Sequence, residues 1–311
     1  MNVKITVLVL FHFWTTINGY KILGLFPHPG KSHFDAFRPL LKALAEKGHE
    51  VTVISYFPQK NPMKNYKDID INGELKLHTH AVNVDDFTGA RYEKYILPIV
   101  LAYFGYRSCD DGLSNKDLHE FLKTKPKFDI VLAEFFNSQC FLGIVHQLNN
   151  PPIIGLSSCI VMPWHSIAFG HSSNPAYIPN SFMPFSTHMT FFERVENTVL
   201  YLFHQAIFKF LIDIPGQWQA RKHLGNDIPD LNDIATNSSL ILVNNHFTYT
   251  SSRPLVPGYI EVGGMFIGKP KKLPQWGIEK SSSRRFNDID PVAMVHVGWE
   301  NVSVPYVSVA D

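Results

Sequence analysis

The chain has 311 residues, of which 45% are hydrophobic and 18% charged. This composition supports a sizeable core and excludes a largely disordered protein. The formal net charge is +1, from 28 basic and 27 acidic side chains. Nucleic-acid binding shows as a basic patch or stripe, so we expect no nucleic-acid partner.

The first residues have the pattern of a secretory signal peptide. Lys4 precedes an apolar run at residues 5–14, and small or polar residues follow before Tyr20. The run is too short to span a bilayer. We therefore expect residues 1–19 to be a cleaved signal peptide, with an uncleaved anchor as the alternative.

Cysteines and glycosylation sequons bear on the compartment. The three cysteines, Cys109, Cys140 and Cys159, do not form a disulfide framework, and their odd number leaves at least one thiol free. They lack a catalytic signature, so we expect them to be buried or inert. Asn237 and Asn301 begin N-glycosylation sequons, which become possible sites if the chain enters the endoplasmic reticulum.

A strand–helix–strand unit follows the leader. Residues 21–26 form an apolar strand, and a turn-rich loop, PHPGKSH, occupies residues 27–33. The next helix contains Pro39, which is tolerated near the first turn, so we expect the helix to begin between Asp35 and Arg38. A β-branched strand at residues 51–55 completes a unit that right-handed crossovers require.

The alternation continues along the chain. Further strands are predicted at residues 75–82, 128–133, 152–156, 240–243 and 259–262, and helices at residues 92–106, 116–123, 140–148 and 191–211. Alternating strands and helices predict an α/β fold, Rossmann-like, with a largely parallel sheet and helices on both faces.

One later segment, residues 199–214, is apolar enough to compare with a membrane span. It carries His204, Gln205, Lys209 and Asp213, which are costly in hydrocarbon. We therefore predict an amphipathic helix in the core, with a position against a membrane surface as the alternative.

His33 and Glu134 are the residues that could perform chemistry. Ligands of parallel sheets bind outside the carboxyl ends of the strands, so the loop holding His33 and the end of the 128–133 strand should face one crevice. An imidazole titrates near neutral pH and suits a general base, and a carboxylate can orient it and stabilise its charged form. Spacing alone favours a simpler interpretation, with His33 capping a helix and Glu134 at a solvated strand end.

Other site types are excluded or disfavoured. Gly24 and Gly30 are separated by five residues, two of them proline, which does not fit a P-loop or a dinucleotide fingerprint. His78 and His80 lie two apart on one strand face, but no further ligand stands at a recognised spacing, so we expect no metal site.

Several segments together resemble the UDP-glycosyltransferase family, which includes animal UDP-glucuronosyltransferases, and its insect members especially. In order, they are SHF at 32–34, LAEKGHEVTV at 44–53, FDIVLAE at 128–134, NPAYIP at 174–179, FERVEN at 192–197, SRPLVP at 252–257 and EVGG at 261–264.

The resemblance implies the N-terminal, acceptor-binding domain of a GT-B fold. It makes His33 the base that deprotonates a small lipophilic acceptor for inverting attack on UDP-glucose or UDP-glucuronate, without a metal ion or other cofactor. Glu134 matches the family's supporting aspartate and is one methylene longer. Family members are anchored in the endoplasmic reticulum membrane and face its lumen, where we expect this chain.

The resemblance also predicts the domain organisation. Residues 20–270 match the acceptor-binding domain, whereas residues 271–311 resemble no part of the family and are expected to be a divergent, poorly ordered tail. The donor-binding domain and the C-terminal transmembrane helix of the family have no counterpart in this sequence. We therefore predict a truncated UDP-glycosyltransferase. The alternative is a non-catalytic lipophile-binding or regulatory isoform that associates with full-length transferases or a membrane surface.

Overall fold

A computed structural model describes residues 19–75, 77, 92–171 and 173–268. Its centre is a seven-stranded sheet in which every paired strand is parallel, in the order β3-β2-β1-β4-β5-β6-β7. The strands are β1 (Lys21–Phe26), β2 (Glu50–Ser55), β3 (Tyr66–Asp70), β4 (Ile130–Glu134), β5 (Ile153–Ser157), β6 (Ser238–Val243) and β7 (Tyr259–Glu261). The Rossmann-like fold predicted from the alternation is confirmed.

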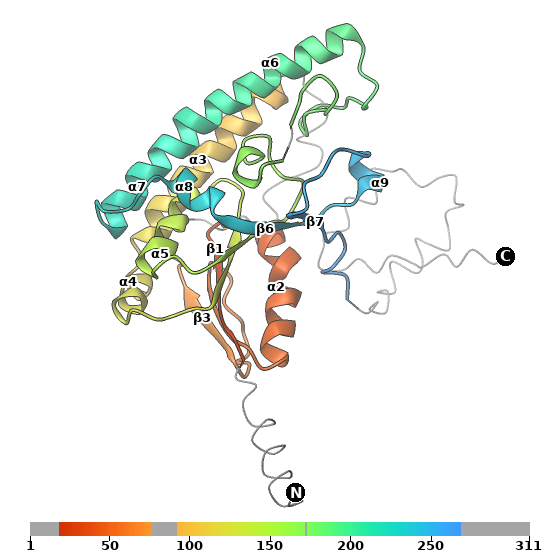
Figure 1. Cartoon of the computed structure of the whole chain (residues 1–311). Coiled ribbons are helices and arrows are strands. Elements are labelled where there is room, and N and C mark those ends of the chain that lie inside the picture. The colour runs from red at the N-terminus through yellow and green to blue at the C-terminus, as the bar shows by residue number, and fades with distance from the viewer. Residues whose placement is uncertain (1–18, 76, 78–91, 172, 269–311) are drawn as a thin grey trace, which may run out of the picture.

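Helices cover both faces of the sheet (Figure 1). The α-helices are α2 (Lys31–Glu46), α3 (Glu93–Leu113), α4 (Lys116–Lys123), α5 (Leu142–Gln147), α6 (Phe191–Ile207), α7 (Ile214–Leu224), α8 (Leu231–Thr236) and α9 (Phe247–Thr250). Two 3₁₀ turns, η2 (Gln139–Phe141) and η3 (Ile167–Phe169), and a π-helical segment, η4 (Phe208–Asp213), complete the described elements.

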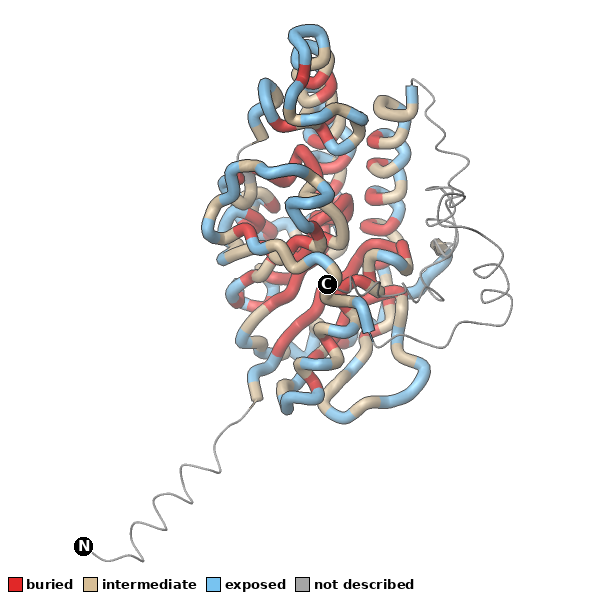
Figure 2. The backbone as a smooth tube through the Cα atoms, turned by 90° about the vertical axis from the view of Figure 1, so that its right-hand side faces the viewer, coloured by how far each residue is buried: buried red, intermediate tan, exposed pale blue. Residues whose placement is uncertain are grey.

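The core consists of two layers, one on each side of the sheet. Along β1, Leu23 and Leu25 contribute to the layer beneath α3, α4, α5, α7 and α8, whereas Ile22 and Phe26 pack towards α2. This alternation follows from the period of two in a strand. Figure 2 shows the buried positions concentrated in the strands and on the inward faces of the helices. Both faces of the central strands are therefore apolar, as expected for a parallel sheet.

The start predicted for the first helix is wrong. Helix α2 begins at Lys31, and Pro39 lies inside it. Pro39 has no backbone N–H, so the carbonyl of Asp35 lacks its usual helical hydrogen bond. Because Pro39 is exposed, both its ring and this carbonyl are on the solvent side. The buried face of α2, which includes Phe34 and Phe37, holds the helix together. As a consequence, His33 lies in the first helical turn and not in the preceding loop.

The third strand also differs from the prediction. The segment 75–82 lies largely outside the described residues, and its described positions, Leu75 and Leu77, are not in a strand. The strand beside β2 is instead β3, with the mostly polar sequence YKDID. The helix predicted at 116–123 matches α4, and the remaining predicted strands match β4 to β7 within one to two residues at each end.

A disulfide joins Cys109 in α3 to Cys140 in η2, and Cys159 is free. Both bonded cysteines are buried, at 2% and 0% exposure. Gly105, one turn earlier in α3, lies so close to Asn137 that an added Cβ would be 2.2 Å from the Asn137 carbonyl oxygen. Disulfide and close contact together fix α3 against the segment that follows β4.

Helices α6, η4 and α7 form one continuous helix of 34 residues. It begins with a capping box, in which Thr190 and Glu193 satisfy each other's backbone amides. Its most apolar window has a mean hydropathy of 1.2, and 33% of that window is buried. By length and composition alone it could cross a membrane, although a core helix can meet the same criterion. One face belongs to the core, as predicted, but the other remains exposed.

Candidate active site

The topological switch point of the sheet lies between β1 and β4. From β1 the chain adds β2 and β3 on one side, then crosses back to place β4 on the other. Ligands of doubly wound folds bind at this point, beyond the carboxyl ends of the strands. His33 follows β1 in the first turn of α2, and Glu134 is the last residue of β4.

The structure brings His33 and Glu134 together. Nδ1 of His33 lies 2.7 Å from Oε1 of Glu134. The side chain of Glu134 is 2% exposed, whereas that of His33 is 17% exposed. The extra methylene of glutamate therefore does not prevent the pair from forming. His33 is not a side-chain cap, because α2 has no side-chain hydrogen bond at its N-cap.

Ser158 is a third member of this cluster, which we call the His33 cluster. Its Oγ lies 2.7 Å from the same Nδ1 of His33. An ionised carboxylate can only accept, so Nδ1–H donates to Glu134 and Ser158 adds its hydroxyl oxygen as an acceptor of that N–H. A neutral imidazole then carries its lone pair on Nε2. This is the protonation arrangement that a general base requires.

Aromatic rings surround the imidazole of His33. The Phe136 ring and the His28 ring each have their centroid 4.3 Å from that of His33. Nδ1 of His28 lies 3.1 Å from Oδ1 of Asn137, in a buried hydrogen bond. Gly30 permits this arrangement, because an added Cβ would lie 2.6 Å from Nε2 of His28. The two rings restrict the rotation of the His33 imidazole, and Phe136 adds an apolar contact to its polar neighbours.

Burial also shapes the other groups near Glu134. Its second oxygen, Oε2, has no hydrogen-bond partner in the described part of the chain. Burial, together with the negative charge of Glu134, raises the pKa of the Cys159 thiol to about 12. Cys159 is therefore a neutral thiol at physiological pH and a poor nucleophile.

Sequence reasoning found His33 and Glu134 but missed Ser158 and His28. Ser158 directly follows β5, the neighbour of β4 in the sheet. Ser158 could have been predicted, because it lies at the same carboxyl edge of the sheet as Glu134. His28 had no comparable signal, because its place depends on the path of the loop before α2.

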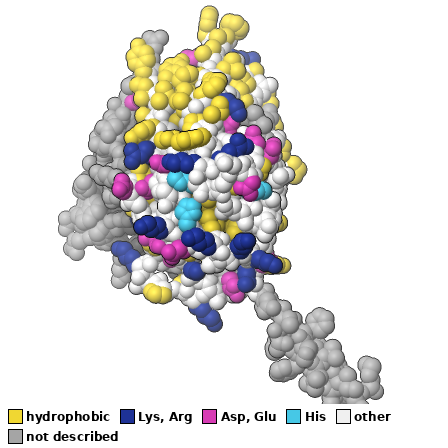
Figure 3. Space-filling view, turned by 90° about the vertical axis from the view of Figure 1, so that its left-hand side faces the viewer, with side chains coloured by type: hydrophobic (Ala, Val, Ile, Leu, Met, Phe, Trp, Pro, Cys, Tyr) yellow, Lys and Arg dark blue, Asp and Glu magenta, His cyan; other side chains and the backbone are white. Residues whose placement is uncertain are grey.

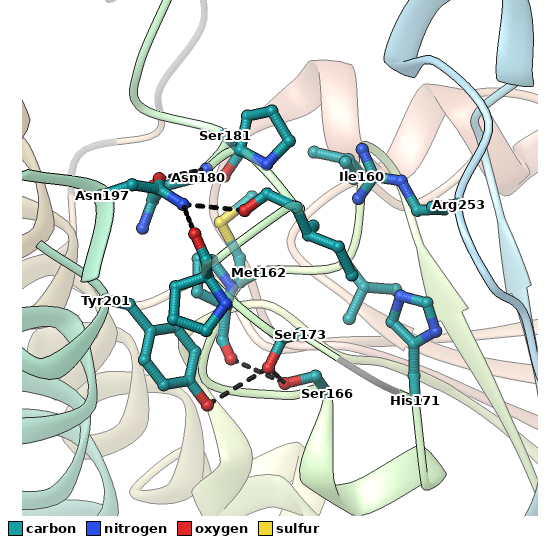
Figure 4. A pocket seen from close by; sticks show the side chains of 15 residues that line it. Ile160, Met162, Ser166, His171, Ser173, Asn180, Ser181, Asn197, Tyr201 and Arg253 are labelled. Carbon is teal, nitrogen blue, oxygen red and sulfur yellow. Dashed lines mark hydrogen bonds between the residues drawn. The ribbon is translucent and has the colours of Figure 1, made fainter. Parts of the chain in front are cut away.

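A small pocket lies beside the segment that follows Ser158 (Figure 4). Ile160 and Met162 contribute apolar surface, with Tyr201 from α6 on one side and His171 and Arg253 on the other. A hydrogen-bonded chain runs from Ser166 through Ser173 to the Tyr201 hydroxyl, with steps of 3.0 and 3.1 Å. His33 and Glu134 do not line this pocket.

His165 is fully buried behind the site. Its Nε2–H donates to the Phe136 carbonyl at 2.9 Å, and its Nδ1 accepts from the Gln139 amide at 3.1 Å. Burial lowers the pKa of His165 to about 4, with the Phe136 hydrogen bond opposing this in part. The histidine is therefore neutral in the folded protein at neutral pH.

We expect this histidine to make the fold acid-sensitive. An unfolded histidine titrates near 6.5, so the unfolded state binds the proton first and stability falls as the pH drops from about 6.5 towards 4. A difference of this size corresponds to about 3 kcal/mol. Urea unfolding at pH 7.5 and pH 4.5 should show it, and His165→Asn should have a smaller pH dependence. An unchanged pH dependence in that variant would contradict the assignment.

The remaining predicted positions do not join the His33 cluster. Asn237 is exposed at the C-cap of α8, where a glycan has room. Asn301 lies outside the described residues, as do residues 1–18 and 269–311. Within the described ranges, no group of three His, Cys, Asp or Glu side chains could hold a metal ion.

The fold is a parallel α/β domain, and a histidine hydrogen-bonded to a carboxylate lies at its switch point. Such an arrangement can bind a small ligand and accept a proton from it. The chain belongs to the family described as UDP-glucoronosyl and UDP-glucosyl transferase, whose profile matches residues 23–284. The resemblance seen in the sequence motifs is thereby confirmed.

Individual relatives agree with this family. UDP-glucosyltransferase 2 of Dactylopius coccus is 34% identical over 281 residues, covering 88% of this chain and 53% of that protein. UDP-glucuronosyltransferase 3A1 of Bos taurus is 27% identical, and the match covers 79% of this chain and 48% of the bovine protein. The chain therefore spans about half the length of the curated relatives it matches.

A solved structure is also similar. It is that of Phytolacca americana UGT2 complexed with UDP-2fluoro-glucose and pterostilbene, with 12% identity, a TM-score of 0.37, and coverage of 79% of this chain and 54% of that one.

Proposed function

We propose that this chain is the acceptor-binding half of an inverting UDP-glycosyltransferase. In the proposed reaction, Nε2 of His33 removes the proton from an acceptor hydroxyl. The resulting oxygen attacks the anomeric carbon of UDP-glucose or UDP-glucuronate, the bond from that carbon to the diphosphate breaks, and UDP leaves. The proposed reaction uses no metal ion.

The observation that carries this proposal is the 2.7 Å contact between His33 Nδ1 and Glu134 Oε1. It supports a base whose free lone pair is on Nε2 and whose positive charge, once formed, is stabilised by a buried carboxylate. An apolar contact at the base supports a lipophilic acceptor. Phe136, whose ring contacts the His33 imidazole, belongs to a buried apolar cluster with Met162 and Trp164.

We further propose that the chain resides in the lumen of the endoplasmic reticulum. The Cys109–Cys140 disulfide supports an oxidising compartment. The exposed Asn237 sequon is compatible with glycosylation there. To test both sequons, the chain is expressed through a secretory pathway, and its mass is compared before and after treatment with an N-glycosidase.

The transfer activity is tested with two proteins. One is the chain itself, and the other joins residues 1–268 to the C-terminal half of UDP-glucosyltransferase 2 of Dactylopius coccus. Each is incubated with UDP-glucose and a phenolic acceptor, and the glycoside is measured by mass spectrometry. Product from the chimera supports the proposal, whether or not the chain alone is active. If the chimera folds and binds UDP but forms no glycoside, the acceptor-half assignment is overturned. A chain that binds the acceptor without transfer in either protein would fit the non-catalytic alternative.

Ser158→Ala should reduce the transfer rate of the chimera moderately. The serine supplies one of two contacts to Nδ1 of His33, and one such hydrogen bond is worth about 1 kcal/mol, or roughly a fivefold change in rate. We expect kcat to fall while KM for the acceptor stays the same. Ser186→Ala, at an exposed position, is the control. A rise in KM with unchanged kcat would show that Ser158 binds the acceptor and does not position His33.

A further inference from the structure

Asn244 lies beside the His33 cluster at the carboxyl edge of the sheet. It directly follows β6, as Ser158 directly follows β5. The two strands are parallel neighbours, and Ser157 pairs in register with Val243. The residue after each strand therefore stands at the same level of the edge. Because the strand order is β4-β5-β6, Asn244 is on the side of Ser158 opposite to β4.

Three hydrogen bonds hold Asn244 between two segments of the chain. Its backbone N–H donates to the Ser157 carbonyl at 2.8 Å. Its side-chain Nδ2–H donates to the Ser158 carbonyl at 2.9 Å, and its Oδ1 accepts from the Gly264 N–H at 3.3 Å. This network determines the orientation of the amide, because the reverse orientation would place two acceptors together and two donors together. Nδ2 of Asn244 therefore faces Ser158.

The turn that contains Gly264 is held in place independently of Ser158. Gly264 has a φ of +80°, which glycine adopts without steric cost. The turn is fixed to the end of β6 by two backbone hydrogen bonds, from the Val262 N–H to the Val243 carbonyl at 2.8 Å and from the Gly263 N–H to the Asn245 carbonyl at 3.1 Å. In Figure 1, β6 and β7 lie side by side where this turn follows β7. The Asn244 side chain thus has a fixed partner on the side away from Ser158.

Ser158 connects Asn244 to the base. Its carbonyl accepts from the Asn244 amide, and its Oγ lies 2.7 Å from Nδ1 of His33. Holding the carbonyl restricts the backbone from which the short serine side chain extends, and so restricts the position of Oγ. We propose that Asn244 is a positioning residue for His33 and acts through Ser158. The role of His33 as a base rests on the proposed function, whereas the hydrogen bonds that position it do not.

The neighbouring Asn245 provides a matched control. Its side chain is buried, at 6% exposure, and donates to Oγ1 of Thr250 at 2.8 Å and to Oε1 of Glu261 at 2.5 Å. These partners belong to α9 and β7, so this amide stabilises the fold beyond β6. Asn245→Ala is therefore expected to lower stability without loosening His33. Asn244→Ala keeps its backbone hydrogen bond to Ser157, so it removes only the side-chain contacts.

The first test measures His33 directly, in the chain itself. In protein with ¹⁵N-labelled histidine, NMR detects the Nδ1 proton of His33, which is assigned by its loss in His33→Ala. This proton exchanges with water only when its hydrogen bonds open. We expect exchange to be about fivefold faster in Asn244→Ala, the effect of weakening one such bond, and unchanged in Asn245→Ala. Asn244→Ser, which keeps a polar side chain, should give the same increase and replaces Asn244→Ala if that variant does not fold.

The second test measures transfer by the chimera. Asn244→Ala should lower kcat by up to about fivefold, the loss expected for Ser158→Ala, with the acceptor KM unchanged. The variant that carries both changes should be no slower than Ser158→Ala, because Asn244 acts through Ser158, whereas independent effects would multiply to about 25-fold. Leu202→Ala is a further control with an unchanged rate. Leu202 is exposed on α6, and Figure 3 shows hydrophobic side chains gathered over the end of the molecule where α3 and α6 lie.

The outcomes separate this proposal from the proposed function. Unchanged exchange of the His33 proton in Asn244→Ala overturns the positioning role, and so does an equal increase in Asn245→Ala. A proton that exchanges too fast to observe in the wild type, or a multiplied loss of kcat in the double variant, overturns it as well. If the chimera forms no glycoside while exchange rises in Asn244→Ala and not in Asn245→Ala, the proposed function fails and the positioning of His33 by Asn244 stands.

Discussion

Replacement of His33 by alanine should remove most of the transfer activity of the chimera. His33 is the one described imidazole held by the Glu134 carboxylate at the switch point, and alanine leaves no group there to accept the hydroxyl proton. General-base catalysis contributes roughly 10²–10⁴-fold. We therefore expect kcat to fall by about that factor, while acceptor binding measured by calorimetry changes little. Initial rates of glycoside formation give the result.

Two further variants make this prediction specific. His188→Ala replaces an exposed histidine outside the cluster and should leave the rate unchanged. Glu134→Gln keeps the shape of the side chain but removes the charge that stabilises the imidazolium, and it should lower kcat with little change in acceptor KM. Full activity of His33→Ala would show that another group takes the proton.

The order of strands and helices was predictable because the core strands are short apolar runs separated by helical patterns. Strand β3 was missed because its sequence, YKDID, has one buried residue, Ile69, and lies at the edge of the sheet. An edge strand with polar side chains gives little hydrophobic signal. The start of α2 was missed because a proline was expected only near the first turn of a helix. That expectation takes no account of exposure, and Pro39 lies inside α2 on its solvent-facing side.

The candidate site was predictable only in part. Strand order places the residues after β1 and β4 at one edge of the sheet, which brought His33 and Glu134 into consideration. Their hydrogen bond depends on side-chain conformation and on the helical position of His33, which spacing does not encode. The same limit explains why Ser158 and His28 were missed, since each reaches His33 from a separate loop.

The disulfide could not be predicted from three cysteines. Cys109 and Cys140 are separated by 31 residues, and their pairing requires that α3 lies across the segment after β4. The close contact between Gly105 and Asn137 places α3 there. Only the tertiary structure therefore distinguishes Cys140 from Cys159 as the partner of Cys109.

Removing this disulfide with Cys109→Ala and Cys140→Ala should lower the free energy of unfolding by about 3–4 kcal/mol. The bond closes a loop of 31 residues in the unfolded chain, and the chain-entropy relation gives a stabilisation of that size for such a loop. Because both cysteines are buried, the variant also loses some packing, which adds to the effect. Urea unfolding followed by circular dichroism at pH 7.5 measures the difference.

Reduction separates the cross-link from the packing. A strong thiol reductant should destabilise the wild-type chain but leave the double-alanine variant unchanged, because Cys159 has no disulfide to lose. Cys159→Ala should respond to the reductant as the wild type does. If the reductant has no effect on the wild type, the two cysteines are not bonded in the folded protein. The disulfide would then no longer support an oxidising compartment, while the contact between His33 and Glu134 would be unaffected, since it does not involve either cysteine.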